Sequence, residues 1–257
     1  MNWSRVKTIL ILFFLCTNLF LLGVILISGK RANTISEEIM TSTVEILEKN
    51  QIKLDASLIP KRAARLPEVA CEPLAEDDEW IFQLLGEQAE KMEDASFQSE
   101  LGTVSLSDQR FSFSGRIPLE NHPEGEQKAI LSVLQKCGIN RSQVKLQKAD
   151  AEGKWNLTEW VNEAEIFDQS LELTVSDHAI VQMDGSWFVS LKSQKEIQEQ
   201  KNAAAILLDF VEMADRPQQE STIVSLELGY AYSEGLYPAW RITLSDGSSY
   251  LMDAREK

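Results

Sequence analysis

The chain has 257 residues, 44 % of them hydrophobic, and a formal net charge of −15. Positions 1–31 hold four Lys/Arg and no acid, so all 40 acids lie after position 31, against 21 bases. The chain beyond position 31 has no basic stripe to neutralise phosphates, which argues against nucleic acid or an anionic membrane surface as its partner. Its length suffices for one large domain or two small ones.

The first predicted element is a transmembrane helix over residues 9–28. No ionisable side chain occurs between Ile9 and Ile27, where only Thr17, Asn18 and Gly23 are not plainly hydrophobic. At about 1.5 Å per residue this run spans roughly 28 Å, close to the hydrocarbon core of a bilayer. A cleaved signal peptide is the alternative, but its apolar region usually has about 7–15 residues and ends at a small-x-small site, which the sequence lacks here. We therefore expect an uncleaved anchor in the cell membrane.

The orientation of this single-pass anchor is predicted from its flanks. Two bases precede the apolar run and two follow it, so the positive-inside rule gives a tie. A short tail before a long domain favours moving the C-terminal part across the membrane. We expect a cytoplasmic tail over residues 1–8 and an extracytoplasmic C-terminal part.

Asn18 is a polar residue near the middle of this apolar helix. In lipid, an amide gains roughly 0.6–2 kcal/mol by hydrogen bonding to another helix. A tolerated polar residue that faces lipid is the alternative. Contact with a second helix is favoured, which indicates a membrane partner.

Residues 29–75 are expected to form a juxtamembrane segment. Ser36 is a candidate N-cap for a helix over 37–50, because acids follow it in the first turn. A short strand over 51–55 comes next, and then a linker that contains Pro60 and Pro67. The acids at 76–79 fit a helix N-terminus better than a metal site.

Two α+β modules are predicted after this segment. The first, over residues 76–190, begins with a helix from Trp80 and continues with a hairpin over 102–117, a helix over 124–137 and further strands. The second, over 191–257, begins with a long helix over 195–214 and ends as a meander with a turn at Ser245-Asp246-Gly247. Strand-Ser-Asp-turn sequences end at Asp108, Asp177 and Asp246, which are equally spaced along the chain, and this fits two repeated helix-plus-hairpin units. The predicted class is α+β, with antiparallel sheets and helices on one face.

Motifs of known chemistry are sparse. His122 and His178 fall in separate predicted turns, and the chain has no G-x-S-x-G elbow, H-E-x-x-H sequence or glycine-rich phosphate loop. A glycosidase needs only two suitably placed carboxylates, so the sequence leaves this activity formally open. Because none of the motifs named above is present, we expect no catalytic residues, no metal, no cofactor and no small-molecule substrate. Cys71 and Cys137 can form a bridge or stay independent thiols, and the sequence leaves both open.

A family resemblance is carried by residues 1–10, 14–22, 46–54, 59–60, 228–230, 237–242, 246–247 and 250, toward both ends of the chain. These segments resemble the YycI (WalI) family of Gram-positive bacteria. The family begins with D/N-W-x-x-x-K-T-I and carries N-x-F-L-L in its single transmembrane helix. The match is looser between residues 75 and 220.

The resemblance implies a regulator rather than an enzyme. Members of the family are anchored with the soluble part outside and are built of helix-and-antiparallel-sheet modules. With a companion, YycH, they associate with the sensor histidine kinase of the essential cell-wall two-component system, largely through transmembrane helices. Asn18 lies in the matching motif, so it and its helical neighbours Phe14, Leu15, Leu21 and Leu22 are the expected partner-binding residues.

Other function classes stay open beside this one. A cell-envelope enzyme that acts on wall polymers through paired carboxylates would require a cleft in which acids gather. A stand-alone binding module for a protease or for peptidoglycan is a further alternative.

Overall fold

The computed structural model describes residues 13–21, 35–62, 65–73, 79–92, 96–107, 110–120, 122–137, 143–149, 153–186, 189–217 and 219–256. The chain divides into two compact units, and both are discontinuous in the sequence. The first contains residues 1–64, 201–224 and 244–246, and the second contains residues 65–200, 225–243 and 247–257. The contiguous modules expected over 76–190 and 191–257 are a different division, because the C-terminal strands contribute to both units.

Two helices form the centre of the first unit. Helix α2 (Glu37–Lys49) begins at Ser36, whose hydroxyl accepts a hydrogen bond from the backbone N–H of Ile39. Helix α5 (Ala203–Glu212) contacts α2 and buries half of its own side chains. The face of α2 that is buried carries Met40, Thr43 and Leu47.

The first unit also contains a parallel strand pair. Strand β1 (Ile52–Leu54) follows α2, and a 3-10 turn, η1 (Ala56–Leu58), follows β1. Strand β1 pairs in parallel with the first residues of β12 (Ser221–Tyr232). Ile52, Leu54 and Ile223 are buried at this pairing, so the short strand is fixed by its apolar face.

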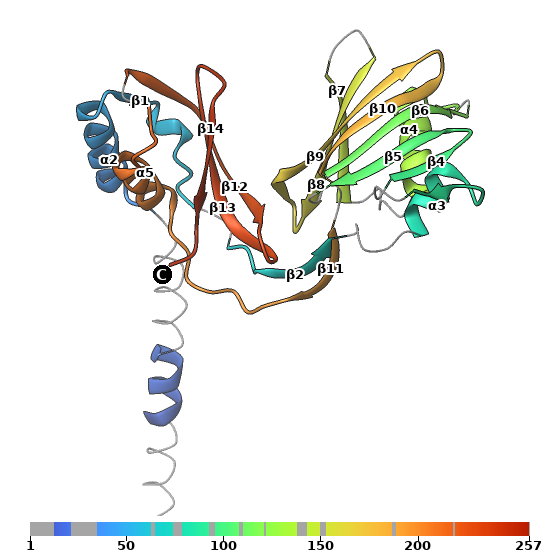
Figure 1. Ribbon diagram of the computed structural model, residues 1–257. Coiled ribbons are helices and arrows are strands. Elements are labelled where there is room, and N and C mark those ends of the chain that lie inside the picture. The colour runs from blue at the N-terminus through green and yellow to red at the C-terminus, as the bar shows by residue number, and fades with distance from the viewer. Residues whose placement is uncertain are drawn as a thin grey trace, which may run out of the picture. The chain divides into compact units, whose positions relative to one another are not determined.

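The second unit is dominated by strands. They are β2 (Val69–Pro73), β3 (Glu90–Lys91), β4 (Ser96–Ser99), β5 (Gly102–Ser107), β6 (Arg110–Pro118), β7 (Val144–Lys148), β8 (Lys154–Val161), β9 (Ala164–Ser176), β10 (Ala179–Ser186), β11 (Val189–Gln194), β13 (Leu236–Leu244) and β14 (Ser249–Asp253). The strand order is β11-β2-β13-β12-β9-β10-β6-β5-β4-β3, with β8 beside β9, β7 beside β8, and β14 beside β13. Figure 1 shows β10, β6, β5 and β4 as neighbours in the sheet.

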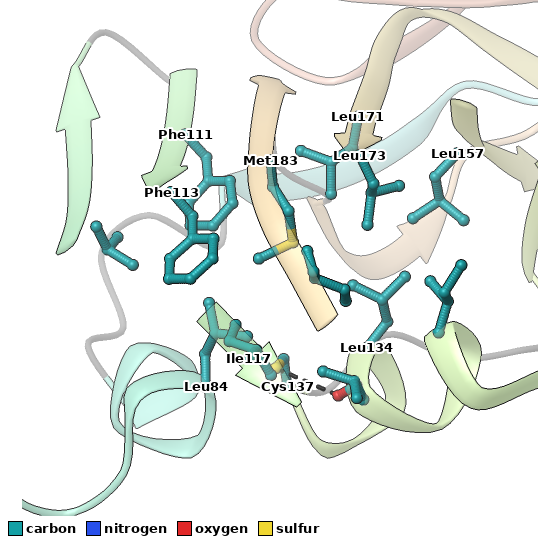
Figure 2. Close-up of a cluster of buried hydrophobic side chains, with 14 of the residues drawn as sticks. Leu84, Phe111, Phe113, Ile117, Leu134, Cys137, Leu157, Leu171, Leu173 and Met183 are labelled. Carbon is teal, nitrogen blue, oxygen red and sulfur yellow. Dashed lines mark hydrogen bonds between the residues drawn. The ribbon is translucent and has the colours of Figure 1, made fainter. Parts of the chain in front are cut away.

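Helices α3 (Glu79–Leu85) and α4 (Glu126–Lys136) contribute to the main core of the second unit. Figure 2 shows Leu84 of α3 and Leu134 of α4 beside apolar side chains of the sheet. The inward residues of the strands alternate with polar ones, as in β9, where Leu171, Leu173 and Val175 are buried. The other face of these strands is therefore polar.

The α+β class is confirmed, but the expectation of antiparallel sheets holds only in part. The sheet is mixed, because β12 pairs in parallel with both β1 and β9. Most other pairs are antiparallel hairpins, with turns at Asp177-His178 between β9 and β10 and at Ser245-Asp246-Gly247 between β13 and β14. The parallel pairs join segments far apart in the sequence, which local turn signals do not reveal.

The helix expected over 195–214 is shorter than predicted, since α5 begins only at Ala203. The backbone N–H of Lys195 donates to the carbonyl of Glu68, and the Gln200 side chain bonds to the backbone N–H of Leu66. These bonds hold residues 195–200 in an extended path. Asn202 then caps α5 through its side-chain oxygen, which accepts from Ala205.

Residues 13–21 are helical. Among the helices that the structure describes, none combines the length and the apolar composition needed to cross a bilayer. The predicted transmembrane segment over 9–28 extends beyond the described residues on both sides, so its full length lies outside what is described. Leu22, one of the expected partner-binding residues, also lies outside the described residues.

Candidate functional site

The N-terminal helix, residues 13–21, is the part of the described chain where exposed apolar side chains are densest. Six large hydrophobic residues expose between 50 and 70 % of their surface: Phe13, Phe14, Leu15, Leu19, Phe20 and Leu21. They lie all round the helix rather than along one stripe. A helix that is apolar on every side is usually buried in a core or in a membrane.

The helical conformation places four of the five sequence-predicted partner residues on one face. Residues three, four and seven apart are neighbours on a helix surface, which brings Phe14, Leu15 and Leu21 around Asn18. Phe20 points to the opposite side. The polar Thr17 donates its hydroxyl hydrogen to the carbonyl of Phe13 at 2.9 Å, so its polar group has a partner within the helix.

A second cluster of side chains surrounds a bulge in the pairing of β9 with β8. Thr158 of β8 pairs with Ser170, and Trp160 pairs with Glu165, so residues 166–169 of β9 lie opposite Glu159 alone. This bulge lets Ile166 pair in parallel with Tyr230 of β12.

Arg241 of β13 makes the ion pairs of this junction. Its Nη1 and Nη2 lie 3.0 and 3.1 Å from the two carboxylate oxygens of Glu165, and its Nε lies 3.1 Å from Glu227. The guanidinium carbon is 4.2 Å from the centre of the Phe167 ring. A bidentate, stacked arginine fixes geometry in a way that lysine does not.

Several C-terminal residues that carry the family resemblance have structural roles at this junction. Gly229 lies under the bulge, where a Cβ would overlap the carbonyl oxygen of Glu165 and the ring of Phe167. Tyr230 is buried, and its hydroxyl accepts a hydrogen bond from Asn162 at 2.9 Å. The sequence pointed to these residues only by resemblance, and the structure gives them an architectural reason.

A buried carboxyl group accompanies the bulge. Burial raises the pKa of Asp168, against the hydrogen bond that its carboxylate accepts from the Tyr232 backbone N–H at 2.7 Å. Burial therefore disfavours the charged form of Asp168, while this hydrogen bond favours it.

Cys71 and Cys137 are both free thiols and both buried. Burial raises the pKa of Cys137 to about 12, and its Sγ donates to the carbonyl of Val133 (Figure 2). Burial also raises the pKa of Cys71, and the nearby carboxylates of Glu159 and Asp168 add to the rise against a hydrogen bond from Leu236. A raised thiol pKa disfavours the reactive thiolate, so both thiols are structural.

The two histidines, which the sequence placed in separate turns, line one hollow of about 200 Å³ beside the N-terminus of α4. Nδ1 of His122 accepts from the backbone N–H of Glu124 at 3.2 Å, which closes the turn before the helix. Within the described residues, His, Cys, Asp and Glu form no group of three or more that could hold a metal ion.

The polar face of the second unit has two further hollows. One, of about 410 Å³, lies beside Trp160 and Asn162 at the β8–β9 hairpin. The other, of about 370 Å³, contains Glu172 and Asp184, which are direct partners across β9 and β10. Sequence patterns missed both hollows, because the lining of each combines residues from several strands.

Comparison with solved structures finds distant neighbours. No family model matches the chain, and no curated protein matches it significantly. A solved structure of an uncharacterized protein from Eubacterium rectale aligns with 86 % of this chain and 94 % of its own, at 9 % sequence identity and a TM-score of 0.45.

Proposed function

We propose that this chain is a non-enzymatic, membrane-anchored regulator that modulates a sensor histidine kinase of cell-wall metabolism. A single transmembrane helix over residues 9–28 would hold it in the cell membrane, with the N-terminus in the cytoplasm and both units outside. The helix would contact the kinase and a YycH-like companion protein.

The observation that carries this proposal is the exposure of large apolar side chains all round residues 13–21. Water is a poor solvent for such a surface, and burial is worth about 25 cal/mol per Å². Lipid and the apolar faces of other transmembrane helices are the surroundings that would cover it on every side. The resemblance of both chain ends to the YycI family names the kind of partner.

Asn18 gives the helix a preferred side. An amide in lipid gains by bonding to a second helix, and here it is surrounded by Phe14, Leu15 and Leu21 on its own face. This arrangement supports a contact on that face, with lipid against the face of Phe20.

The test is photo-crosslinking of the full chain in its native membrane. A photo-reactive residue is placed at position 14, on the Asn18 face, and in a matched variant at position 20, on the opposite face. Captured proteins are identified by mass spectrometry. We expect a sensor kinase or a second single-pass protein from position 14, lost on Asn18→Leu, and mainly lipid from position 20.

Two outcomes contradict the proposal. If positions 14 and 20 both capture only lipid, the helix is a tether without a partner. If a form released from the membrane restores the phenotype of a deletion strain, the membrane contact is not the regulatory one. Either result directs attention to the extracytoplasmic units.

A further inference from the structure

The hollow at the β8–β9 hairpin is built from three segments of the second unit. It is lined by Gln143, Lys145, Trp160, Asn162, Glu163 and Gln194. Its volume of about 410 Å³ lies in the usual range of small-molecule sites, roughly 300–1,000 Å³. It opens on the polar side of the strands, away from the buried face of Leu157 and Leu171.

Trp160 forms the aromatic wall of the hollow. Its indole Nε1 donates to the hydroxyl of Thr158 at 3.1 Å, so the polar edge has a partner and the orientation of the ring is fixed. Lys145 of β7 lies diagonally across the strand pair, with its Nζ 3.0 Å from the centre of the ring. The flexible ammonium group of Lys145 thus lies against the face of an aromatic ring whose orientation is fixed.

An ordered chain of amides forms the opposite wall. Nδ2 of Asn162 donates to the hydroxyl of buried Tyr230, and Oδ1 of Asn162 accepts from Nε2 of Gln194 at 3.0 Å. Asn162 occupies the tip of the hairpin with φ +49°, a conformation that asparagine tolerates. The polar groups are therefore held in place before any ligand arrives, which lowers the cost of binding.

We propose that this hollow binds an anionic saccharide, namely a pyranose ring that carries a carboxylate. The apolar C–H face of the ring would lie against Trp160, while the amides and Glu163 would bond to its hydroxyl groups. The ammonium of Lys145 would leave the indole ring and pair with the carboxylate.

The first hollow has one acid, Glu163, against one base, whereas the second has two acids against one base, so the first is the better site for a carboxylate. Among the described residues that line the first hollow, Lys145 is the one cation, and its partner is an aromatic ring rather than a fixed anion. The second hollow on the same face also contains a lysine, Lys154, but combines it with Glu172 and Asp184, which would repel a carboxylate. A peptide would need more apolar lining than Trp160 supplies.

The test is saturation-transfer NMR on the full chain in detergent micelles, with the methyl glycosides of glucuronic acid and glucose as probes. The two probes differ only in the carboxylate. We expect binding of the glucuronide, weaker binding of the glucoside, and loss of both on Trp160→Ala. Lys145→Met should weaken glucuronide binding by roughly tenfold, the size of one charge-assisted bond, and remove the preference between the probes.

Lys154→Met is the matched control, because it removes a lysine from the other hollow of the same face. It should leave both affinities unchanged. Thermal unfolding of each variant shows whether the protein still folds, and Lys145→Met keeps the test valid if Trp160→Ala does not. Failure of the glucuronide to bind, or equal binding by the wild type and Lys145→Met, would overturn the proposal. The inference does not depend on the proposed kinase partner, since crosslinking from the helix and NMR at the hollow report separately.

Discussion

Helix α5 and the N-terminal helix over residues 13–21 are both short and both strongly apolar, yet their surroundings are opposite. In α5, Ile206, Leu207 and Phe210 are fully buried. In the N-terminal helix, Phe13 and Phe20 expose about 70 % of their surface. Within the described residues, α5 has α2 as a neighbour, while the N-terminal helix keeps its apolar surface uncovered.

The difference shows that an apolar helix is stabilised by burial, but that its apolar content alone does not say whether protein or lipid buries it. In α5 the polar Asp209 and Glu212 leave one side suitable for water, and Lys201 pairs with Asp209 at 2.7 Å. Residues 13–21 have no such charged side. A helix with one polar side fits a protein surface, whereas a helix without one fits lipid.

The comparison is tested most severely by removing one phenylalanine from each helix. Phe210→Ala should lower the free energy of unfolding of the folded units by about 3–5 kcal/mol, through lost burial and a cavity. Phe20→Ala should change it by less than about 0.5 kcal/mol, because no described residue packs over that ring. Urea unfolding of the full chain in micelles, followed by circular dichroism, measures both. Similar losses for the two variants would show that the N-terminal helix packs on the folded protein.

Helix α2 carries both kinds of surface and sharpens the comparison on neighbouring residues. Leu47 is fully buried and Ile46 is 38 % exposed. Leu47→Ala should cost about 2–5 kcal/mol of unfolding free energy, and Ile46→Ala less than about 1 kcal/mol. The same urea titration applies. A cost for Ile46→Ala that appears only in membranes would reveal a partner on this side of α2.

Asn18→Leu tests the membrane side of the comparison. Loss of an interhelical hydrogen bond of roughly 0.6–2 kcal/mol should reduce the crosslinking yield from position 14 by about three- to thirtyfold. The unfolding of the two folded units should not change. Asn18→Gln, which keeps the amide, is the control and should retain most of the yield.

The smallest expected effect is a change of stability with pH. It arises from Asp168, which lies in neither of the two apolar helices compared above. Because burial raises the pKa of Asp168, the folded state keeps a proton that the unfolded state has already released. Its contribution to stability is therefore most favourable below the ordinary pKa of the carboxyl, and it falls as pH rises through the raised value. Asp168→Asn keeps an acceptor for the Tyr232 N–H and should flatten this part of the curve of stability against pH. An unchanged curve would mean that Asp168 is not the group responsible.

Much of the fold followed from local signals in the sequence. The cap at Ser36, the glycine turn at Gly247 and the alternation in β9 are properties of a few adjacent residues. The α+β class is visible from such patterns. The parallel pairs of β12 were missed, because they join Ile52 to Ser221 and Ile166 to Tyr230, and no periodicity links such distant segments.

Of the two candidate sites, the face of the N-terminal helix could be predicted from the sequence, whereas the hollow at Trp160 could not. The spacing of Phe14, Leu15, Asn18 and Leu21 predicts a shared helix face, which needs only a helical backbone. The hollow at Trp160 depends on a bulge, a hairpin tip and a distant glutamine, so its residues come together only in three dimensions. The helix expected from residue 195 failed because tertiary hydrogen bonds to Glu68 and Leu66 override a local preference for helix.

The discontinuity of the first unit has a consequence for synthesis. Helix α2 ends at residue 49, and α5, which contacts it, begins only at residue 203. At about 5–20 residues per second, the ribosome takes roughly 8–30 s to make the intervening chain. During this interval the apolar face of Met40 and Leu47 has emerged and its partner has not. The first unit therefore cannot complete its folding while its N-terminal part alone has been synthesised. We expect chaperones that bind nascent chains to cover α2 until α5 has been made.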